Sequence, residues 1–400
     1  MGVSAIIAFN FSIFLLLWEY MDTLIRARNF LSEKKYKWML KPILFKIDPE
    51  KVHDNMSAVG HFLGEYWITR KISKAFWSYS NPALEQNILG INFKNPIGLS
   101  AGFDKNADLT EIIPCVGFGF MEVGSVTGEP CGGNPAPRLW RLPKSKSLAV
   151  YYGLMNDGCE IIAKKLHAKL FFKKFAIPVG INIAKTNCQA TVETNAAIRD
   201  YFKAYKTFAK IGDYFTINIS CPNVFGGQPF TDKPKLDALL EKIMSIPKVK
   251  PIFIKLSPDL KQEKIDGIIG LASKWKIDGF ICANLTKNRD VKENKNILDK
   301  NLPVVGGLSG KIVEDLSLDL IRYVYKKTHK NESRFVIIGV GGVFSASDAY
   351  KKIKAGASLV QLITGMIFEG PQLISSINLG LVKLLQADGY KNISEAVGKE

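Results

Sequence analysis

Eight short apolar runs, each followed by a segment with helix-like spacing, constrain this chain more than any other feature. The runs are too continuously apolar for a half-exposed antiparallel sheet, so they favour parallel strands covered by helices. Eight such units predict a closed (β/α)₈ barrel in preference to an open doubly wound sheet. The expected strands are 95–102, 118–126, 177–184, 213–220, 251–257, 278–285, 334–342 and 359–365.

Polar or glycine residues follow the end of each expected strand. In a TIM barrel of this kind, active sites lie at the C-terminal ends of the strands, so these residues should converge on one mouth. The residues at the strand ends are Lys105, Ser125, Asn182, Asn218, Lys255, Asn284, Gly341, Gly342 and Thr364.

Two glycine-containing strand ends predict a phosphate site. Gly341 and Gly342 follow the seventh strand, just before a helix that opens near Ser345, and Thr364 and Gly365 end the eighth strand. Backbone N–H groups at such positions bind anions, and loops seven and eight are the usual phosphate grip of this barrel. The sequence therefore predicts a phosphorylated cofactor or substrate.

The segment Asn218–Asn223, NISCPN, follows the fourth strand and places two amides and a thiol at the mouth. A thiol with an ordinary pKa of about 8.5 needs only a modest shift, for example from a nearby lysine, to act as a base near neutrality. Lys105 and Lys255 lie at or just past strand ends and are the cations expected there. The alternative for Cys221 is a buried inert cysteine, which is our interpretation of the other five cysteines.

The N-terminal part is expected to associate with a membrane. Residues 3–18 form an apolar run slightly shorter than the roughly 20 residues that span a bilayer, so residues 1–20 are a possible anchor. The basic residues after it place the protein body on the cytoplasmic or equivalent side. Residues 21–80 read as an amphipathic helical extension with large apolar side chains, and 81–400 as the barrel domain. The alternatives are a buried or interfacial helix for the run and a simple cap for the extension.

Composition narrows the chemistry further. The six cysteines are scattered singly, and none of the four histidines has metal-ligand spacing, so we expect neither disulfides nor a metal. The net charge of +17 suits a membrane surface, a nucleic acid or simple solubility, and does not choose among them.

Several long motifs, in order, resemble those of the dihydroorotate dehydrogenases. They are SAGFDKNA, FGFMEVGSVTGEP, NPAPRLWRLP, NISCPN, IKLSPDL, CANLT, GGLSG, IGVGGV and LVQLITG, and KPILFKIDPEKVH resembles the extension of the membrane-bound, quinone-reducing class. The resemblance implies oxidation of dihydroorotate to orotate on FMN, in pyrimidine biosynthesis. It implies substrate binding by Lys105, Asn218, Asn223 and Asn284. It implies FMN binding by Ala101, Gly102, Lys105, Ser125, Asn182, Asn218, Lys255, Gly310, Gly341, Gly342, Thr364 and Gly365.

Three positions depart from that family pattern. Cys221 stands where the membrane-bound class usually has serine, and resembles the soluble classes that reduce fumarate or NAD. Val150 replaces a usual substrate-binding asparagine, and Leu285 replaces a usual hydroxyl residue. Asn156 is our candidate for the missing amide.

The resulting hypothesis gives Cys221 the proton from C5 of dihydroorotate while a hydride leaves C6 for FMN. Quinone is the expected acceptor, with His53 and Arg141 as candidate quinone-site residues, and fumarate or NAD is the alternative. Two more remote alternatives are a tRNA dihydrouridine synthase and a membrane-tethered FMN protein without turnover. We expect no nucleic-acid partner, and we expect the cytoplasmic face of a cell inner membrane or, alternatively, the mitochondrial inner membrane. The oligomeric state is left open.

Overall fold

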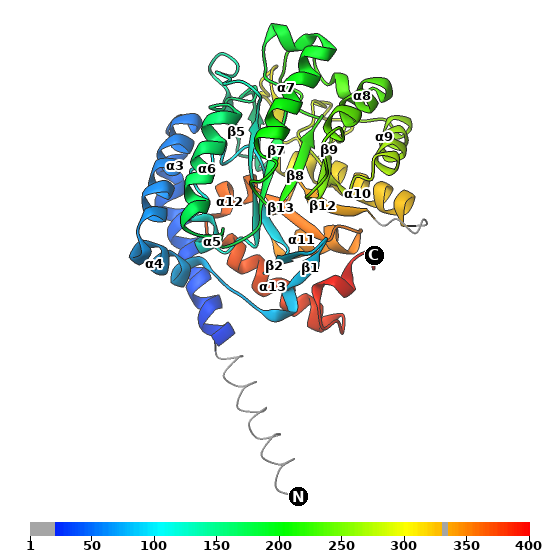
Figure 1. The fold of residues 1–400 in the computed structure, drawn as a ribbon. Coiled ribbons are helices and arrows are strands. Elements are labelled where there is room, and N and C mark those ends of the chain that lie inside the picture. The colour runs from blue at the N-terminus through cyan, green and yellow to red at the C-terminus, as the bar shows by residue number, and fades with distance from the viewer. Residues whose placement is uncertain (1–20, 330–334) are drawn as a thin grey trace, which may run out of the picture.

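A closed barrel of eight parallel strands forms the centre of the computed structural model, which describes residues 21–329 and 335–400 (Figure 1). Each barrel strand lies within one of the eight predicted runs, so the predicted (β/α)₈ barrel is confirmed. In order around the barrel the strands are β3 (Ile97–Leu99), β4 (Phe120–Val126), β7 (Val179–Ile183), β8 (Tyr214–Asn218), β9 (Ile252–Leu256), β10 (Gly279–Cys282), β12 (Val336–Val340) and β13 (Leu359–Leu362).

Helices cover the outside of the barrel (Figure 1). Each presents one apolar face to the strands; in α7, for example, Ile198, Tyr201 and Tyr205 are buried at helical spacing. The covering helices are α5 (Ile113–Val116), α6 (Cys159–Phe172), α7 (Thr194–Thr207), α8 (Lys233–Ile243), α9 (Gln262–Lys274), α10 (Glu314–Thr328), α11 (Ala346–Lys354) and α13 (Leu373–Ala387), and the short α12 (Thr364–Glu369) follows β13.

The lower interior of the barrel is filled by aromatic rings that lie against glycines of the neighbouring strands. Gly98 pairs with Phe120, and a Cβ on Gly98 would lie 2.4 Å from that ring. Gly180 pairs with Tyr214 in the same way, and its Cβ would lie 2.2 Å from the Tyr214 ring. Because the rings occupy this space, the barrel is a packed core here and leaves room for ligands only at its other end.

Two small antiparallel sheets were not expected from the sequence. The hairpin of β1 (Gln86–Ile88) and β2 (Ile91–Phe93) packs Phe93 against Phe120, with ring centroids 5.4 Å apart. A second sheet joins β5 (Leu139–Leu142), β6 (Ser147–Val150) and β11 (Gly307–Leu308). This second sheet brings together two loops that are far apart in the sequence, and both contribute to the functional cavity.

The segment before the barrel is helical, as its amphipathic spacing predicts. Residues 21–35 form a helix, followed by the π-helical turn η1 (Tyr36–Leu40) and by α2 (Lys41–Leu44), α3 (Pro49–Glu65) and α4 (Trp67–Trp77). Most of the exposed large hydrophobic side chains of the described residues lie here. In the part of the chain that the structure describes, no helix is both long and apolar enough to cross a membrane. The predicted anchor at 1–20 lies outside the described residues.

The extension is fastened to the helix that follows β13. Tyr36 donates its hydroxyl hydrogen to the carbonyl of Ile367 at 2.6 Å. The carboxylate of Glu369 in α12 pairs with both Lys37 and Lys146, the latter at 3.1 Å. The extension therefore contacts the same short helix whose first residue, Thr364, lies in the functional cavity.

Candidate active site

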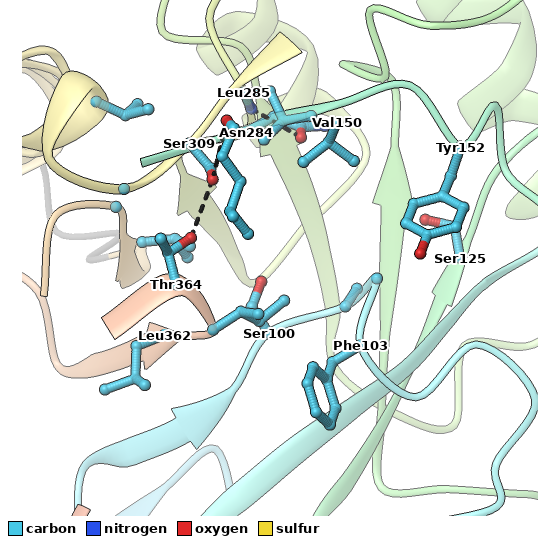
Figure 2. Close-up of a pocket in the computed structure, with 18 of the residues that line it drawn as sticks. Ser100, Phe103, Ser125, Val150, Tyr152, Asn284, Leu285, Ser309, Leu362 and Thr364 are labelled. Carbon is cyan, nitrogen blue, oxygen red and sulfur yellow. Dashed lines mark hydrogen bonds between the residues drawn. The ribbon is translucent and has the colours of Figure 1, made fainter. Parts of the chain in front are cut away.

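A cavity with an open volume of about 200 Å³ lies at the C-terminal ends of the barrel strands. Residues from α3 to α12 line it, and those labelled in Figure 2 run from Ser100 to Thr364. The structure brings fifteen of the residues predicted for the site into its lining: His53, Ala101, Gly102, Lys105, Ser125, Asn218, Cys221, Asn223, Lys255, Asn284, Gly310, Gly341, Gly342, Thr364 and Gly365.

Lys255 brings a buried cation into this cavity from β9. Its ammonium lies 3.4 Å from the Ser100 hydroxyl, which is a long contact for a group with three donors. Burial lowers the pKa of Lys255, and the nearby carboxylate of Glu122 opposes that effect. Much of the hydrogen-bonding capacity of Lys255 is therefore left for a group bound in the cavity.

A chain of amides links the strand ends on one side of the cavity. The Asn284 amide donates to Asn218 Oδ1 at 3.2 Å, and the Asn218 amide donates to the Ser125 hydroxyl at 2.9 Å. Asn223 donates to the carbonyl of Val150 at 2.7 Å, while its own Oδ1 is buried without a partner in the described structure. A buried acceptor without a donor is costly, so a ligand N–H group would fit there.

Cys221 lines the cavity beside these amides. Burial raises the pKa of its thiol to about 11, although a backbone N–H group of Asn223 and the charges of Lys255, Lys185 and Lys287 each lower it. The expectation of a lowered thiol pKa was therefore wrong in sign for the ligand-free protein, because burial outweighs the lysines. The three lysines still decide how far the pKa rises.

Lys105 and His53 lie near the outer part of the cavity. The Lys105 ammonium lies 3.4 Å from the centroid of the Tyr152 ring. Burial lowers the pKa of Lys105 to about 8, against the raising effect of Asp54 and Glu50 on α3. Burial, with the charge of Lys105, lowers the pKa of His53 to about 3, so its imidazole is neutral at pH 7.

Three predicted site residues do not line the cavity. Asn182 accepts from Ser125 at 2.5 Å and donates to Glu122 at 3.0 Å, so it supports a lining residue from beneath. The Asn156 amide donates to Thr127 and accepts from Gly158, which occupies it within its own loop. Arg141 donates to the carbonyl of Ile47 at 2.7 Å and faces the extension. Asn156 is therefore not placed to replace the missing amide at Val150.

The phosphate site predicted at the ends of strands seven and eight offers backbone and hydroxyl groups. Gly341 and Gly342 adopt φ values of +119° and +72°, which side chains rarely permit, at the end of β12. Figure 2 shows the Thr364 hydroxyl pointing to that of Ser309, at 2.9 Å. The described lining of the cavity includes no Asp or Glu side chain, so no negative charge there would repel a bound anion.

Several lining residues were not selected from the sequence. Tyr152 lies in the motif that contains Val150, but nothing in the sequence places its ring against Lys105. Val150 and Leu285 do face this cavity together with Asn284 (Figure 2), so the two departures from the family pattern make its wall more apolar. Lys185, which follows β7 and lies outside this lining, was missed although the rule of polar residues after strand ends would have found it. Across the described residues, no cluster of three His, Cys, Asp or Glu side chains has metal-site geometry.

Comparison with known proteins identifies relatives over nearly the whole chain. A family model described as dihydroorotate dehydrogenase matches residues 83–385. The dihydroorotate dehydrogenase (quinone) of Trichodesmium erythraeum (strain IMS101) is 36% identical over 376 residues, which cover 91% of this chain and 98% of that protein. The protein of the same name from Natronomonas pharaonis is 37% identical over 363 residues, 90% of this chain and 98% of that protein. Among solved structures, the Eimeria tenella enzyme in complex with ferulenol has a TM-score of 0.77 and 29% identity, and covers 88% of this chain and 95% of its own.

Proposed function

The chain belongs to the dihydroorotate dehydrogenase family, in its quinone-reducing class, and from that premise we propose that FMN is its flavin and that Cys221 is its catalytic base. The enzyme oxidises dihydroorotate to orotate and passes the electrons to a quinone. The relatives decide between the acceptors left open by the sequence, because those named above are quinone enzymes although this chain has a cysteine at 221. The residue roles that follow are our proposal.

The cavity suits FMN where the ends of β12 and β13 line it. Gly341, Gly342, Thr364 and Gly365 line it there, and their backbone N–H groups and the Thr364 hydroxyl would bind the phosphate. The Lys255 ammonium, held only by its long contact with Ser100, has donors to spare for a flavin ring. Bound FMN would supply the acceptor for the hydride from C6 of the substrate and the donor of electrons to the quinone.

The amide chain suits a small uracil-like acid. The unpaired Oδ1 of Asn223 would accept an N–H group of the substrate ring, and Asn218 and Asn284 supply further polar atoms beside it. Lys105 supplies a positive charge for the substrate carboxylate. Val150 and Leu285 would contact the ring by packing alone, so fewer hydrogen bonds hold the substrate here than the family pattern implies.

The observation that carries the mechanism is that Cys221 shares one cavity with these three amides and with Lys255. A thiolate there can remove the proton from C5 of dihydroorotate, and Lys255 favours that thiolate. Because the thiol is largely protonated at neutral pH, the rate of flavin reduction should rise with pH from 7 toward 10.

Anaerobic stopped-flow mixing with dihydroorotate tests this assignment. Cys221→Ala should retain its flavin but bleach it slower by about two orders of magnitude or more, the usual scale for a lost general base. Cys221→Ser, which keeps a weak base, is the matched control and should fall between the two. Bleaching of the alanine variant at the wild-type rate would refute the role of Cys221.

We further propose that the extension holds the enzyme on a membrane surface and admits the quinone there. Exposed Trp38, Phe62 and Trp67 lie on it, and Lys34 and Lys71 lie over the rings of Trp38 and Trp67 at 4.9 Å. Such aromatic and basic surfaces bind the lipid interface. The cytoplasmic face of a cell inner membrane, or the mitochondrial inner membrane, is the proposed location.

The apolar wall of the cavity faces the extension. Leu139, Leu148, Tyr152, Phe344 and Phe368 form one cluster, and Phe45 of the extension packs on Phe368 at 5.3 Å. His53 lies at the same side of the cavity, and Arg141 lies beside Ile47, so both remain our candidates for contact with quinone.

Flotation with vesicles of mixed anionic and zwitterionic lipid tests the membrane proposal. A protein from which residues 1–20 are removed should still bind, and the further change of Trp38, Phe62 and Trp67 to serine should abolish binding. Flavin reduction by dihydroorotate should be unchanged in both proteins, because none of these side chains lines the cavity. Equal flotation of both proteins would contradict the proposed surface.

A further inference from the structure

Cys221 also lines a second, smaller cavity, which shares Leu154 and Asn218 with the main one. Its open volume is about 10 Å³, close to the room that one water needs. Lys185, Tyr201 and Gln228 line it together with Cys221. Cys221 is therefore lined on part of its surface by residues that do not belong to the main cavity, Lys185 among them.

Lys185 is a buried cation, only 2% exposed, and the hydrogen bonds of its ammonium within the described structure go to neutral groups. It follows β7, and its ammonium donates to the carbonyl of Phe225 at 2.8 Å and to the carbonyl and hydroxyl of Thr191 at 3.2 and 3.3 Å. Burying a charge that is bonded only to neutral groups costs free energy, so Lys185 lowers the stability of the fold.

The bond to Phe225 fixes the loop that carries Cys221. Two residues after Lys185, Asn187 Oδ1 accepts the backbone N–H of Phe225 at 2.7 Å. Both backbone polar groups of Phe225 are therefore held by the segment that follows β7. On the other side of the loop, Gln228 donates to the carbonyl of Ser220 at 3.0 Å.

We propose that Lys185 is a positioning residue for the reaction: through its bond to Phe225 it fixes the loop of the base, and its charge, beside Cys221 in the small cavity, favours the thiolate. The inference rests on the proposed role of Cys221. According to this proposal a lysine acts on the thiol from each of the two cavities that Cys221 lines. Lys255 lines the substrate cavity, and Lys185 lines the small one.

The other groups facing this pair do not cancel the charge of Lys185. Lys255 on β9 and Lys287 after β10 act on the thiol in the same direction as Lys185. Asp200 on α7 lies near Lys185, as does Cys188, but the Asp200 carboxylate is bonded to the backbone and hydroxyl of Thr186. Tyr201, the remaining titratable lining residue, donates its hydroxyl hydrogen to the carbonyl of Asn218 and stays neutral.

Two pH profiles test the proposal on the flavin-loaded enzyme. One is the rate of flavin reduction by dihydroorotate, and the other is the rate at which iodoacetamide alkylates Cys221 without substrate, followed by peptide mass spectrometry. Loss of a neighbouring positive charge raises a thiol pKa by about one unit. In Lys185→Met both profiles should move up by about one pH unit, so both rates should fall about tenfold at every pH well below the thiol pKa of about 11 and approach those of the unchanged protein only above it.

Two further variants separate charge from loop anchoring. Asn187→Ala loosens the same loop at Phe225 but removes no charge, so it should lower the rates at every pH and leave the midpoints in place. Lys185→Arg keeps the charge and should restore the midpoints. Lys185→Gln is measured as well, in case the methionine variant does not retain its flavin.

The experiments distinguish failure of the role of Lys185 from failure of the role of Cys221. If the neutral variants of Lys185 shift neither midpoint, or only lower the rates as Asn187→Ala does, the inference about Lys185 is overturned. If Cys221→Ala reduces its flavin as fast as the unchanged protein, the role of Cys221 fails instead, whatever Lys185 does.

Discussion

The lowered pKa of Lys105 predicts that orotate binding weakens in mildly alkaline solution. Burial lowers this pKa to about 8, and the ammonium is expected to hold the ligand carboxylate. At that pKa the free enzyme carries the charge in about 90% of molecules at pH 7 and in about 10% at pH 9. Since only the charged form binds well, the Kd for orotate should rise about tenfold between pH 7 and pH 9.

Two substitutions set the size and the cause of this effect. A hydrogen bond between charged groups contributes roughly 1.5–3 kcal/mol, so Lys105→Met should weaken orotate binding by about 10- to 100-fold at pH 7 and remove the pH dependence. Lys105→Arg stays charged throughout this range, so its Kd should be nearly constant with pH.

The same pKa shift has the opposite sign for folding. The folded protein binds this proton less tightly than the unfolded chain, whose lysine has a pKa near 10.5. The contribution of Lys105 to the free energy of unfolding should therefore increase as pH rises from about 8 to about 10.5. Weaker binding at pH 9 would thus not reflect loss of the fold through this residue.

Titration of the flavin absorbance with orotate, from pH 6.5 to pH 9, measures these constants. Circular dichroism at each pH confirms that the protein remains folded. An orotate Kd that stays constant in the unchanged protein, or that rises equally in Lys105→Arg, would refute the assignment of Lys105.

Three other predictions concern the flavin, the barrel interior and the extension. Lys255→Met should lower both the flavin-to-protein ratio after purification and the rate of flavin reduction, whereas normal values would make Lys255 structural. Gly180→Ala should destabilise the fold by about 1–3 kcal/mol in urea unfolding, because its Cβ would lie 2.2 Å from the Tyr214 ring; adding Tyr214→Leu should restore part of the loss. Glu369→Gln removes a charge bonded to Lys37 and Lys146, so limited proteolysis should cut residues 21–45 faster; an unchanged cleavage rate would mean that Tyr36 and apolar packing suffice to hold the extension.

The barrel was predictable because its strands are buried on both faces, which leaves unbroken apolar runs in the sequence. Each observed strand is shorter than its run. Except in β4, which reaches the end of its run at Val126, the last residues of the run already belong to the functional loop, as Ser220 does after β8. The two antiparallel sheets were missed because their strands have two to four residues, too few to show an alternating pattern.

The residues that line the site were predictable where a motif ends a strand. They were less predictable in loops, where a side chain can form its hydrogen bonds within the loop instead of facing the cavity. Asn156 and Asn223 are both amides in such motifs, yet one bonds within its loop and the other leaves an acceptor in the cavity. Sequence cannot rank these outcomes, because they depend on which backbone groups come within reach. Nor could it give the sign of the Cys221 pKa shift, which sets burial against three lysines from separate strand ends.

The aromatic rings packed against strand glycines restrict which substitutions this family can accept at those positions. Neither Gly180 nor Tyr214 can change alone without a clash or a void, and the same holds for Gly98 and Phe120. The two residues of each pair should therefore be substituted together. Homologues with a larger residue at one position should have a smaller residue at its neighbour. Among homologues, such correlated exchanges should be more frequent at the floor of the barrel than at its mouth, where the ligands set the choice of residue.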